Sequence, residues 1–218
     1  VPEDEPCDRY VYDPDNPVIG DRSFGSDPTV VVRHALAFAD GLHSGGVLSC
    51  GKHFPGHGDT DLDSHLALPR LRHGRQRLDA VELVPFRAAV GKLPSLMTAH
   101  VVFESLDDDL PATMSSRVVR DLLRNEIGYD GAVFSDDLEM KAVSERYAIE
   151  EAGVLAIAAG CDLLLVCSDV DATERLREEL VREAEKSPAF RDRLVDARRR
   201  ADVLRQRAVT LGAPVDLQ

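Results

Sequence analysis

The chain is organised around one polar stretch, GKHFPGHGDTDLDSH, which spans residues 51–65. This stretch contains one lysine, three histidines and three aspartates. Pro55, Gly56 and Gly58 interrupt regular secondary structure, so we predict a loop after its first few residues. A loop that only faces solvent seldom needs so many titratable groups of both signs. A loop that binds a polar substrate and moves a proton does, so the stretch predicts a functional loop.

The composition is that of one globular domain. Of the 218 residues, 44% are hydrophobic and 30% are charged, which is enough for a sizeable core. The formal net charge of −13 has the wrong sign for a nucleic-acid or anionic-membrane surface. The arginines near the C-terminus alternate with acidic and apolar residues, as on a solvated helix face: Arg191, Arg193, Arg198, Arg199 and Arg200. We expect neither nucleic acid nor membrane as a partner.

The cysteines indicate a reducing compartment. Cys7, Cys50, Cys161 and Cys167 form no Cys-x-x-Cys pair and no zinc-ligand spacing. Three of them lie in or beside apolar runs, where a free cysteine behaves as a small hydrophobic residue. The sequence has no apolar run of transmembrane length and no signal-peptide pattern. We therefore expect a cytoplasmic protein.

Short apolar runs alternate with helical patterns along the chain. We predict strands over 47–50, 96–103, 131–134 and 162–167, and helices over 29–44, 78–91, 115–127, 149–159, 172–186 and 189–209. This alternation predicts a parallel sheet covered by helices. Polar residues follow successive strands: Lys52 and His53, then His100, then Asp136, then Ser168 and Asp169. Sites spread over several strand ends favour a (β/α)8 barrel over a doubly wound sheet, although only about four of its eight strands are recognisable.

Lys52 and His53 invite a comparison with a phosphate-binding P-loop. Gly46 begins the pattern Gly, four residues, Gly-Lys, but His53 follows where a P-loop has Ser or Thr. The intervening residues, Val-Leu-Ser-Cys, are typical of a strand. We therefore predict that Lys52 and His53 are hydrogen-bond donors at a strand end, where they hold hydroxyl groups or a carbonyl.

Metal binding is an alternative use of the loop. Imidazole and carboxylate groups suit zinc and other transition metals, and the loop offers His53, His57, Asp59, Asp61, Asp63 and His65. No helical His-Glu-x-x-His pattern accompanies them. A metal-dependent barrel hydrolase therefore stays open as a hypothesis, which loss of activity on chelation would support.

Three further positions are candidates for proton transfer or nucleophilic attack. Asp63 can hydrogen-bond His65, fix its tautomer and stabilise its imidazolium, so that His65 can donate and recover a proton. Asp136 follows a strong strand and is a candidate nucleophile or base, although Asp136 or Asp137 could instead cap the next segment. His100 ends its strand in a similar way, and the sequence leaves it open whether this histidine lines the site or is structural.

Four motifs in order resemble glycoside hydrolase family 3, specifically its bacterial β-N-acetylglucosaminidase branch. They are Gly20-Asp-Arg-Ser-Phe24, Lys52-His-Phe-Pro-Gly-His-Gly-Asp-Thr60, Asp63-Ser-His65 and Phe134-Ser-Asp-Asp-Leu138. The resemblance runs from about Asn16 to about Cys167. It implies a retaining glycosidase on a (β/α)8 barrel, without metal or organic cofactor, that acts on a small carbohydrate as a monomer.

The resemblance also implies residue roles. Asp136 corresponds to the nucleophile, and His65, supported by Asp63, to the acid/base. Arg22, Lys52 and His53 correspond to residues that hold the sugar hydroxyls. Because other branches take their acid/base from elsewhere, the Asp-Ser-His motif favours terminal N-acetylglucosaminides, which in cells are peptidoglycan fragments.

The chain departs from the family pattern at its start. Family members carry further residues ahead of the matched region, including the first barrel strands and an aspartate that grips the substrate. We therefore expect 1–218 to be a single domain that forms the C-terminal two-thirds of the barrel, with an irregular lead-in over 1–12 and a helix and tail over 189–218. Two alternatives to the hydrolase follow: an inactive carbohydrate-binding remnant, or a phosphorylase or other β-glycosidase of the same family.

Overall fold

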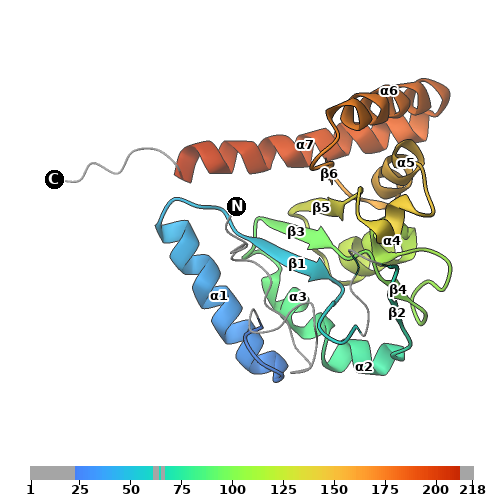
Figure 1. Ribbon diagram of the computed structural model, residues 1–218. Helices are drawn as coiled ribbons and strands as arrows, with labels where there is room; N and C mark the ends of the chain where they lie inside the picture. Colours follow the sequence, from blue (N-terminus) through green and yellow to red (C-terminus); the bar gives the residue numbers. More distant parts are fainter. Residues whose placement is uncertain (1–22, 61–63, 65–66, 212–218) are drawn as a thin grey trace.

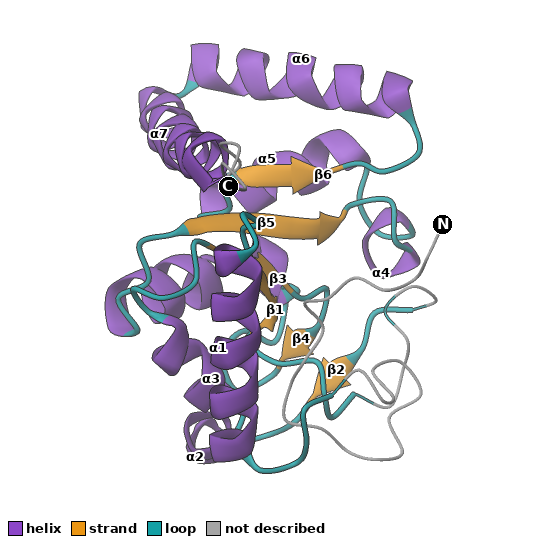
Figure 2. Ribbon diagram, turned by 90° about the vertical axis from the view of Figure 1, so that its left-hand side faces the viewer, coloured by secondary structure: helices purple, strands orange, loops and turns teal. Residues whose placement is uncertain are grey.

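The computed structural model describes residues 23–60, 64 and 67–211. Four parallel strands form its central sheet in the order β1-β3-β5-β6: β1 (Cys50–Phe54), β3 (Ser95–Thr98), β5 (Ala132–Asp137) and β6 (Leu163–Leu165). Figure 2 shows these strands one beside the next, with a second, two-stranded parallel sheet beyond β1. The second sheet pairs β2 (Arg70–Leu71) with β4 (Val102–Phe103). The carboxyl ends of parallel strands lie at one edge of their sheet. Lys52, His53 and Asp136 lie near this edge, at the ends of β1 and β5.

Helices connect the strands and cover the sheet (Figure 1). α1 (Pro28–Ser44) precedes β1, and α2 (Arg75–Ala80) and α3 (Leu83–Ala89) lie between β2 and β3. The 3₁₀-helix η2 (Ala112–Met114) and the π-helix η3 (Arg117–Glu126) precede β5. α4 (Lys141–Ser144) and α5 (Ile149–Ala159) connect β5 to β6, and α6 (Val170–Lys186) and α7 (Pro188–Leu211) follow. The α/β class with a parallel sheet is therefore confirmed.

The core lies between the sheet and its helices. Phe54, Leu96 and Val133 come from three adjacent strands and have no exposed surface. Phe86 of α3 packs edge-on against Phe54, with 5.1 Å between the ring centroids. A second cluster joins η2, α5 and α6 around residues that are all at least nine-tenths buried: Met114, Leu138, Val143, Ala152 and Leu176. None of the helices within the described ranges is both long and apolar enough to cross a membrane.

Two predicted elements are each divided in the structure. The helix predicted over 78–91 is α2 and α3, because Pro85 has no N–H and is tolerated only in the first turn of a helix. The strand predicted over 96–103 leaves the main sheet after Ala99. The Ala99 N–H donates to the Phe54 carbonyl (2.8 Å), whereas the Val102 N–H donates to the Pro69 carbonyl (2.9 Å) in the second sheet.

Two strand boundaries were also wrong. The strand predicted over 47–50 instead spans Cys50–Phe54. Lys52 and His53 therefore lie within β1, which pairs with β3. The strand predicted over 131–134 continues to Asp137 because β6 pairs with it as far as that residue. Asp136 therefore lies one residue before the end of β5, and the strand fixes its backbone more firmly than a loop would.

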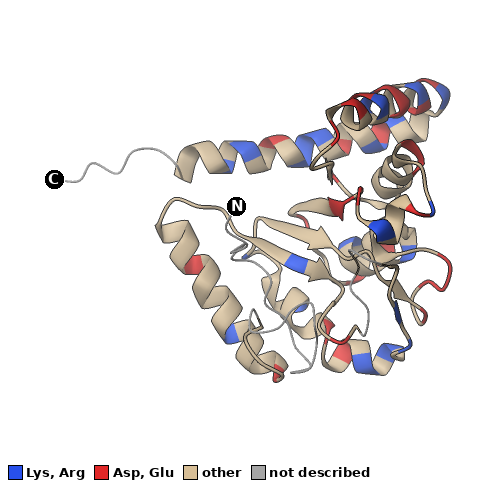
Figure 3. Ribbon diagram, viewed as in Figure 1, with Lys and Arg blue, Asp and Glu red and all other residues tan. Residues whose placement is uncertain are grey.

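The charged residues of α6 and α7 alternate in sign along both helices (Figure 3). Arg198 and Arg199 are exposed and pair with Asp202 and Asp196 of the same helix, at 2.7 and 2.8 Å. The prediction of a solvated face is confirmed for these arginines. It was wrong for Arg193 and Arg200, whose side chains are only 19% and 13% exposed. Arg193 donates to Asp162 ahead of β6, and Arg200 donates to Asp130 ahead of β5.

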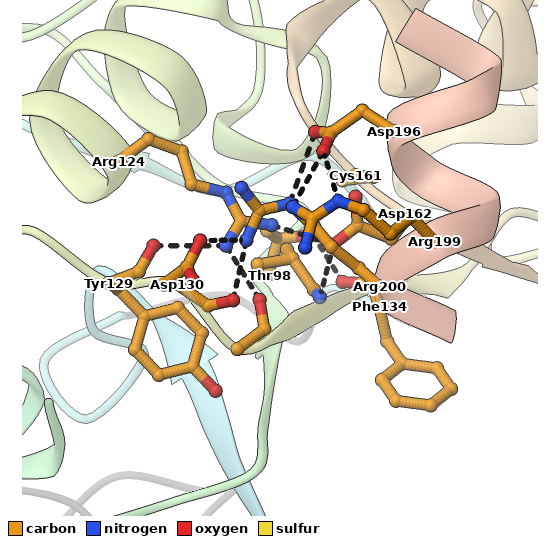
Figure 4. A network of polar contacts seen from close by, with 12 residues as sticks. Thr98, Arg124, Tyr129, Asp130, Phe134, Cys161, Asp162, Asp196, Arg199 and Arg200 are labelled. Carbon is orange, nitrogen blue, oxygen red and sulfur yellow. Dashed lines mark hydrogen bonds and ion pairs between the residues drawn. The ribbon is translucent and has the colours of Figure 1, made fainter. Parts of the chain in front are cut away.

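A buried ion-pair network joins α7 to the sheet (Figure 4). The Asp162 side chain has no exposed surface and accepts hydrogen bonds from Arg124 of η3 (2.6 Å) and from Arg193 of α7. The same carboxylate also accepts from the Val133 N–H of β5 at 2.9 Å. One carboxylate therefore holds two helices against one strand.

Replacement of Asp162 by Asn tests this network. The amide cannot neutralise two adjacent guanidinium groups, so we expect the free energy of unfolding to fall by about 3 kcal/mol. Urea denaturation followed by circular dichroism measures the change. Glu174→Gln, which removes one partner of the exposed Arg177 pair, is the matched control and should leave the midpoint unchanged. Equal effects of the two substitutions would contradict the role assigned to Asp162.

Candidate active site

Two strand ends bring a histidine and a carboxylate together. His53 Nε2 of β1 lies 3.4 Å from Asp136 Oδ2 of β5, and the two side chains are 10% and 16% exposed. β3 separates β1 from β5 in the sheet, so both side chains must reach across the edge of β3. Lys52 precedes His53 and is 92% buried, with 8% of its surface exposed. The structure therefore unites three of the predicted residues: Lys52, His53 and Asp136.

The environment of Asp136 favours its ionised form. Burial raises the pKa of this carboxyl, but His53, His100, the Asp137 N–H and Lys52 together lower it more, so the net pKa lies below the usual value. The Asp137 N–H donates to Asp136 Oδ1 at 2.8 Å. The carboxylate therefore has one oxygen fixed by the backbone and the other facing His53. An ionised, partly desolvated carboxylate held in this way can act as a nucleophile.

His57 forms hydrogen bonds within the polar loop and is not placed to be a metal ligand. It is 1% exposed, and its Nε2 and Nδ1 lie 2.9 Å from Ser64 Oγ and from Thr60 Oγ1. Its ring packs near His53, with 5.5 Å between the centroids. Hydrogen bonds at both ring nitrogens leave no lone pair for a metal ion, so His57 connects the two ends of the loop across 57–64.

Asp59 joins a cluster that the sequence did not reveal. Its Oδ2 lies 2.6 Å from His73 Nε2, and one ligand atom each from Asp59, His73 and Glu82 lies within 4.8 Å of the others. Arg77 already donates to Glu82 Oε1 at 3.0 Å and lies 3.5 Å from Asp59 Oδ2. The guanidinium supplies the positive charge that a metal ion would bring. His73 and Glu82 were missed because nothing in their own local sequence points to this loop.

Gly56 shows how closely this cluster approaches the loop. Its φ is +154°, and a Cβ on Gly56 would come within 2.9 Å of the Glu82 side chain. Glycine is the residue that combines such a backbone with so close a neighbour. Glu82 therefore lies directly against the loop that follows β1.

Ser168 and Asp169 connect two loops of the sheet edge. Ser168 donates to Glu139 from both its N–H and its hydroxyl, at 2.6 Å each, and the Asp169 N–H donates at 3.1 Å. The Asp169 carboxylate in turn accepts from the Ala172 N–H at the start of α6. Glu139, two residues after Asp137, was missed, although its position in an acidic run behind a strand could have indicated it.

Arg22, Asp63 and His65 lie outside the described residues. The structure gives no geometry for these three predicted site residues. Their expected roles stay predictions. Ser64, between Asp63 and His65, is described, 2% exposed and bonded to His57.

Together, the fold and the site define an α/β protein with a largely buried carboxylate, beside a histidine and a lysine, at the carboxyl edge of a parallel sheet. Residues 11–200 match the model of the glycosyl hydrolase family 3 N terminal domain. The chain belongs to this family.

Individual relatives agree with this assignment. A beta-hexosaminidase of Alkalilimnicola ehrlichii is 45% identical over 164 residues, which cover 75% of this chain and 47% of that protein. The structure of a family 3 beta-N-acetylglucosaminidase from Paenibacillus sp. FPU-7 superposes with a TM-score of 0.88 at 42% identity, over 98% of this chain and 41% of the other. NagZ from Neisseria gonorrhoeae, solved with N-trifluoroacetyl-D-glucosamine, gives a TM-score of 0.67 at 35% identity, over 82% of this chain and 58% of the other. The chain thus spans about half the length of the curated relatives it matches.

Replacement of Lys52 by Met tests the electrostatics of the site. Loss of the ammonium group removes a charge that lowers the pKa of Asp136, so this pKa should rise. The carboxylate would then become protonated at a higher pH than in the unmodified chain. ¹³C NMR titration of the Asp136 side chain measures the shift. The control is Lys92→Met, an exposed lysine after α3, and an Asp136 pKa that responds equally to both substitutions contradicts the assignment.

Proposed function

We propose that this chain carries the reaction centre of a retaining exo-β-N-acetylglucosaminidase. The observation that supports the proposal best is the ionised Asp136 carboxylate, fixed by the Asp137 N–H and facing His53. Membership of family 3 and relatives described as beta-hexosaminidases support the substrate class. The substrate would be a terminal β-linked N-acetylglucosamine, with peptidoglycan fragments as the natural source.

Asp136 would act as the nucleophile in the first step. Its carboxylate attacks the anomeric carbon and forms a glycosyl-aspartate ester while the glycosidic bond breaks. His65, as imidazolium, gives its proton to the leaving oxygen, and Asp63 stabilises the positive ring. In the second step neutral His65 takes a proton from water, the water oxygen attacks the anomeric carbon, and Asp136 leaves as carboxylate. Two inversions retain the configuration.

Three side chains that carry N–H donors would bind the sugar. Lys52 and His53 present N–H donors beside Asp136, and Arg22 would supply a third group of donors. Donors held in a buried pocket favour hydroxyl groups whose position they match. The same Lys52 and His53 keep Asp136 ionised, so binding and activation would share residues.

The four-stranded sheet would form one wall of a (β/α)8 barrel. Parallel strands joined by helices, with the site at their carboxyl edge, are the repeating unit of that fold. We propose that residues 1–218 contribute a single domain to it, equivalent to the C-terminal two-thirds of the barrel. The share of the relatives that the chain covers is consistent with this proposal.

Release of p-nitrophenol from p-nitrophenyl β-N-acetylglucosaminide tests the proposed activity. We expect turnover by the unmodified chain and a loss of about 10⁴-fold or more in Asp136→Ala, because the covalent route is removed. Asp171→Ala, an exposed aspartate of α6, is the matched control and should retain full activity.

The same assay separates the alternatives. A folded chain that binds N-acetylglucosamine by calorimetry without turning over the substrate would indicate a carbohydrate-binding remnant. A rate that depends on added inorganic phosphate would indicate a phosphorylase.

Replacement of His65 by Ala tests the acid/base separately from the nucleophile. A p-nitrophenolate leaving group needs little protonation, whereas a sugar alkoxide needs much. We therefore expect kcat/KM for a β-linked disaccharide to fall about 100-fold further than kcat/KM for the p-nitrophenyl glycoside. Steady-state kinetics with the two substrates measure this difference. Equal losses for both substrates would exclude His65 as the acid.

A further inference from the structure

His100 lies fully buried behind the proposed nucleophile. It follows β3, the strand between those that carry His53 and Asp136, and its side chain has no exposed surface. A residue with no exposed surface does not contact substrate. The inference below rests on the proposed function, because it concerns how Asp136 is held for that reaction.

The hydrogen bonds of His100 define its tautomer. Its Nε2 lies 3.0 Å from the Asp137 carbonyl oxygen. A carbonyl can only accept, so Nε2 carries a hydrogen. Burial lowers the pKa of His100 more than the nearby Asp136 carboxylate raises it, so the ring is neutral at neutral pH and Nδ1 is an acceptor.

Two buried threonine hydroxyls lie on the Nδ1 side of the His100 ring. Thr113 Oγ1 lies 2.9 Å from His100 Nδ1, and Thr98 Oγ1 donates to Thr113 Oγ1 at 2.9 Å. Both threonines have no exposed surface. Each threonine hydroxyl has one hydrogen and a carbonyl acceptor of its own: Phe134 O lies 3.2 Å from Thr98 Oγ1, and Ala99 O lies 3.1 Å from Thr113 Oγ1. These contacts connect the His100 ring to β3, β5 and η2. The Asp137 carbonyl, which can only accept, keeps the ring hydrogen on Nε2, where it points at β5.

The Asp137 backbone transmits this constraint to Asp136. The Asp137 carbonyl accepts from His100, while the Asp137 N–H donates to Asp136 Oδ1 at 2.8 Å. The orientation of the carboxylate thus depends on a residue whose own backbone is fixed from both sides.

We propose that His100 is a positioning residue that holds the Asp136 carboxylate in its reactive orientation through the Asp137 carbonyl. The role needs one donor at the position of Nε2. A purely structural role would need only a residue of similar size that fills the space.

Two substitutions distinguish these roles. The amide nitrogen of His100→Gln reaches the position of Nε2 and can donate to the Asp137 carbonyl, whereas the amide of His100→Asn reaches only the position of Nδ1. With the p-nitrophenyl substrate we expect kcat of the Asn variant to fall by about 10- to 100-fold, with KM changed by less than about twofold. The Gln variant should stay within about threefold of the unmodified chain. His34→Asn and His34→Gln, at an exposed position of α1, are controls that should leave both parameters unchanged.

Equal losses of kcat in the Gln and Asn variants, or losses confined to KM, would overturn the proposal. A measurement on the unmodified chain keeps it testable if a variant does not fold or if the chain does not turn over. Long-range ¹H–¹⁵N NMR of the histidine side chains should show His100 neutral, with its hydrogen on Nε2. A hydrogen on Nδ1, or a cationic ring at neutral pH, would overturn the proposal even in an inactive chain. Absence of turnover in the unmodified chain would count only against the proposed function.

Discussion

The parallel pairing of β1, β3 and β5 is the constraint on which the site depends. Leu96 pairs with Gly51 and with Val133, and this register places the ends of three strands at one level. His53 and Asp136 are 83 positions apart in the chain, yet their side chains approach to 3.4 Å. A shift of one residue in either pairing would turn one of these side chains to the opposite face of the sheet. The buried Asp162 network, which holds η3 and α7 against the start of β5, supports the register from the other end of the strand.

The local charge of the site is opposite to that of the whole chain. The chain has a net charge of −13, whereas Asp136 is surrounded by Lys52, His53 and a backbone N–H. A carboxylate in an acidic protein needs such neighbours to stay ionised when it is partly removed from water. A neutral sugar gains little from long-range attraction. The charges around Asp136 therefore act on the reacting carboxylate and on hydroxyl groups in direct contact.

Much of the fold could be predicted from local patterns, and the errors have physical causes. The helices that became α1, α5 and α7 and the parallel α/β class followed from the alternation of short apolar runs with helical patterns. The division of the helix over 78–91 could have been predicted, since Pro85 lies within that range. The transfer of the chain from β3 to β4 depended on hydrogen-bond partners far along the chain. Such tertiary pairings are not visible in a single stretch of sequence.

In the candidate site, too, local motifs could be predicted and tertiary contacts could not. Lys52, His53 and Asp136 were predicted from strand ends and motifs, and the structure brings them together. The cluster of Asp59 with His73, Arg77 and Glu82 was not predicted, since its members come from three different segments. His100 could be placed near the site but not given a role. Its role depends on the contact of Nε2 with the Asp137 carbonyl oxygen, which only coordinates reveal.

The most direct test of the central claim is to find the sugar on Asp136. The chain would be mixed with a p-nitrophenyl N-acetylglucosaminide at a pH that slows the second step, quenched in acid, digested with a protease and examined by tandem mass spectrometry. Our account predicts one N-acetylhexosamine residue attached to the peptide that contains Asp136, with fragment ions that place it on that side chain. Attachment to a different residue, or steady turnover with no labelled peptide under conditions that trap a known retaining glycosidase, would contradict it.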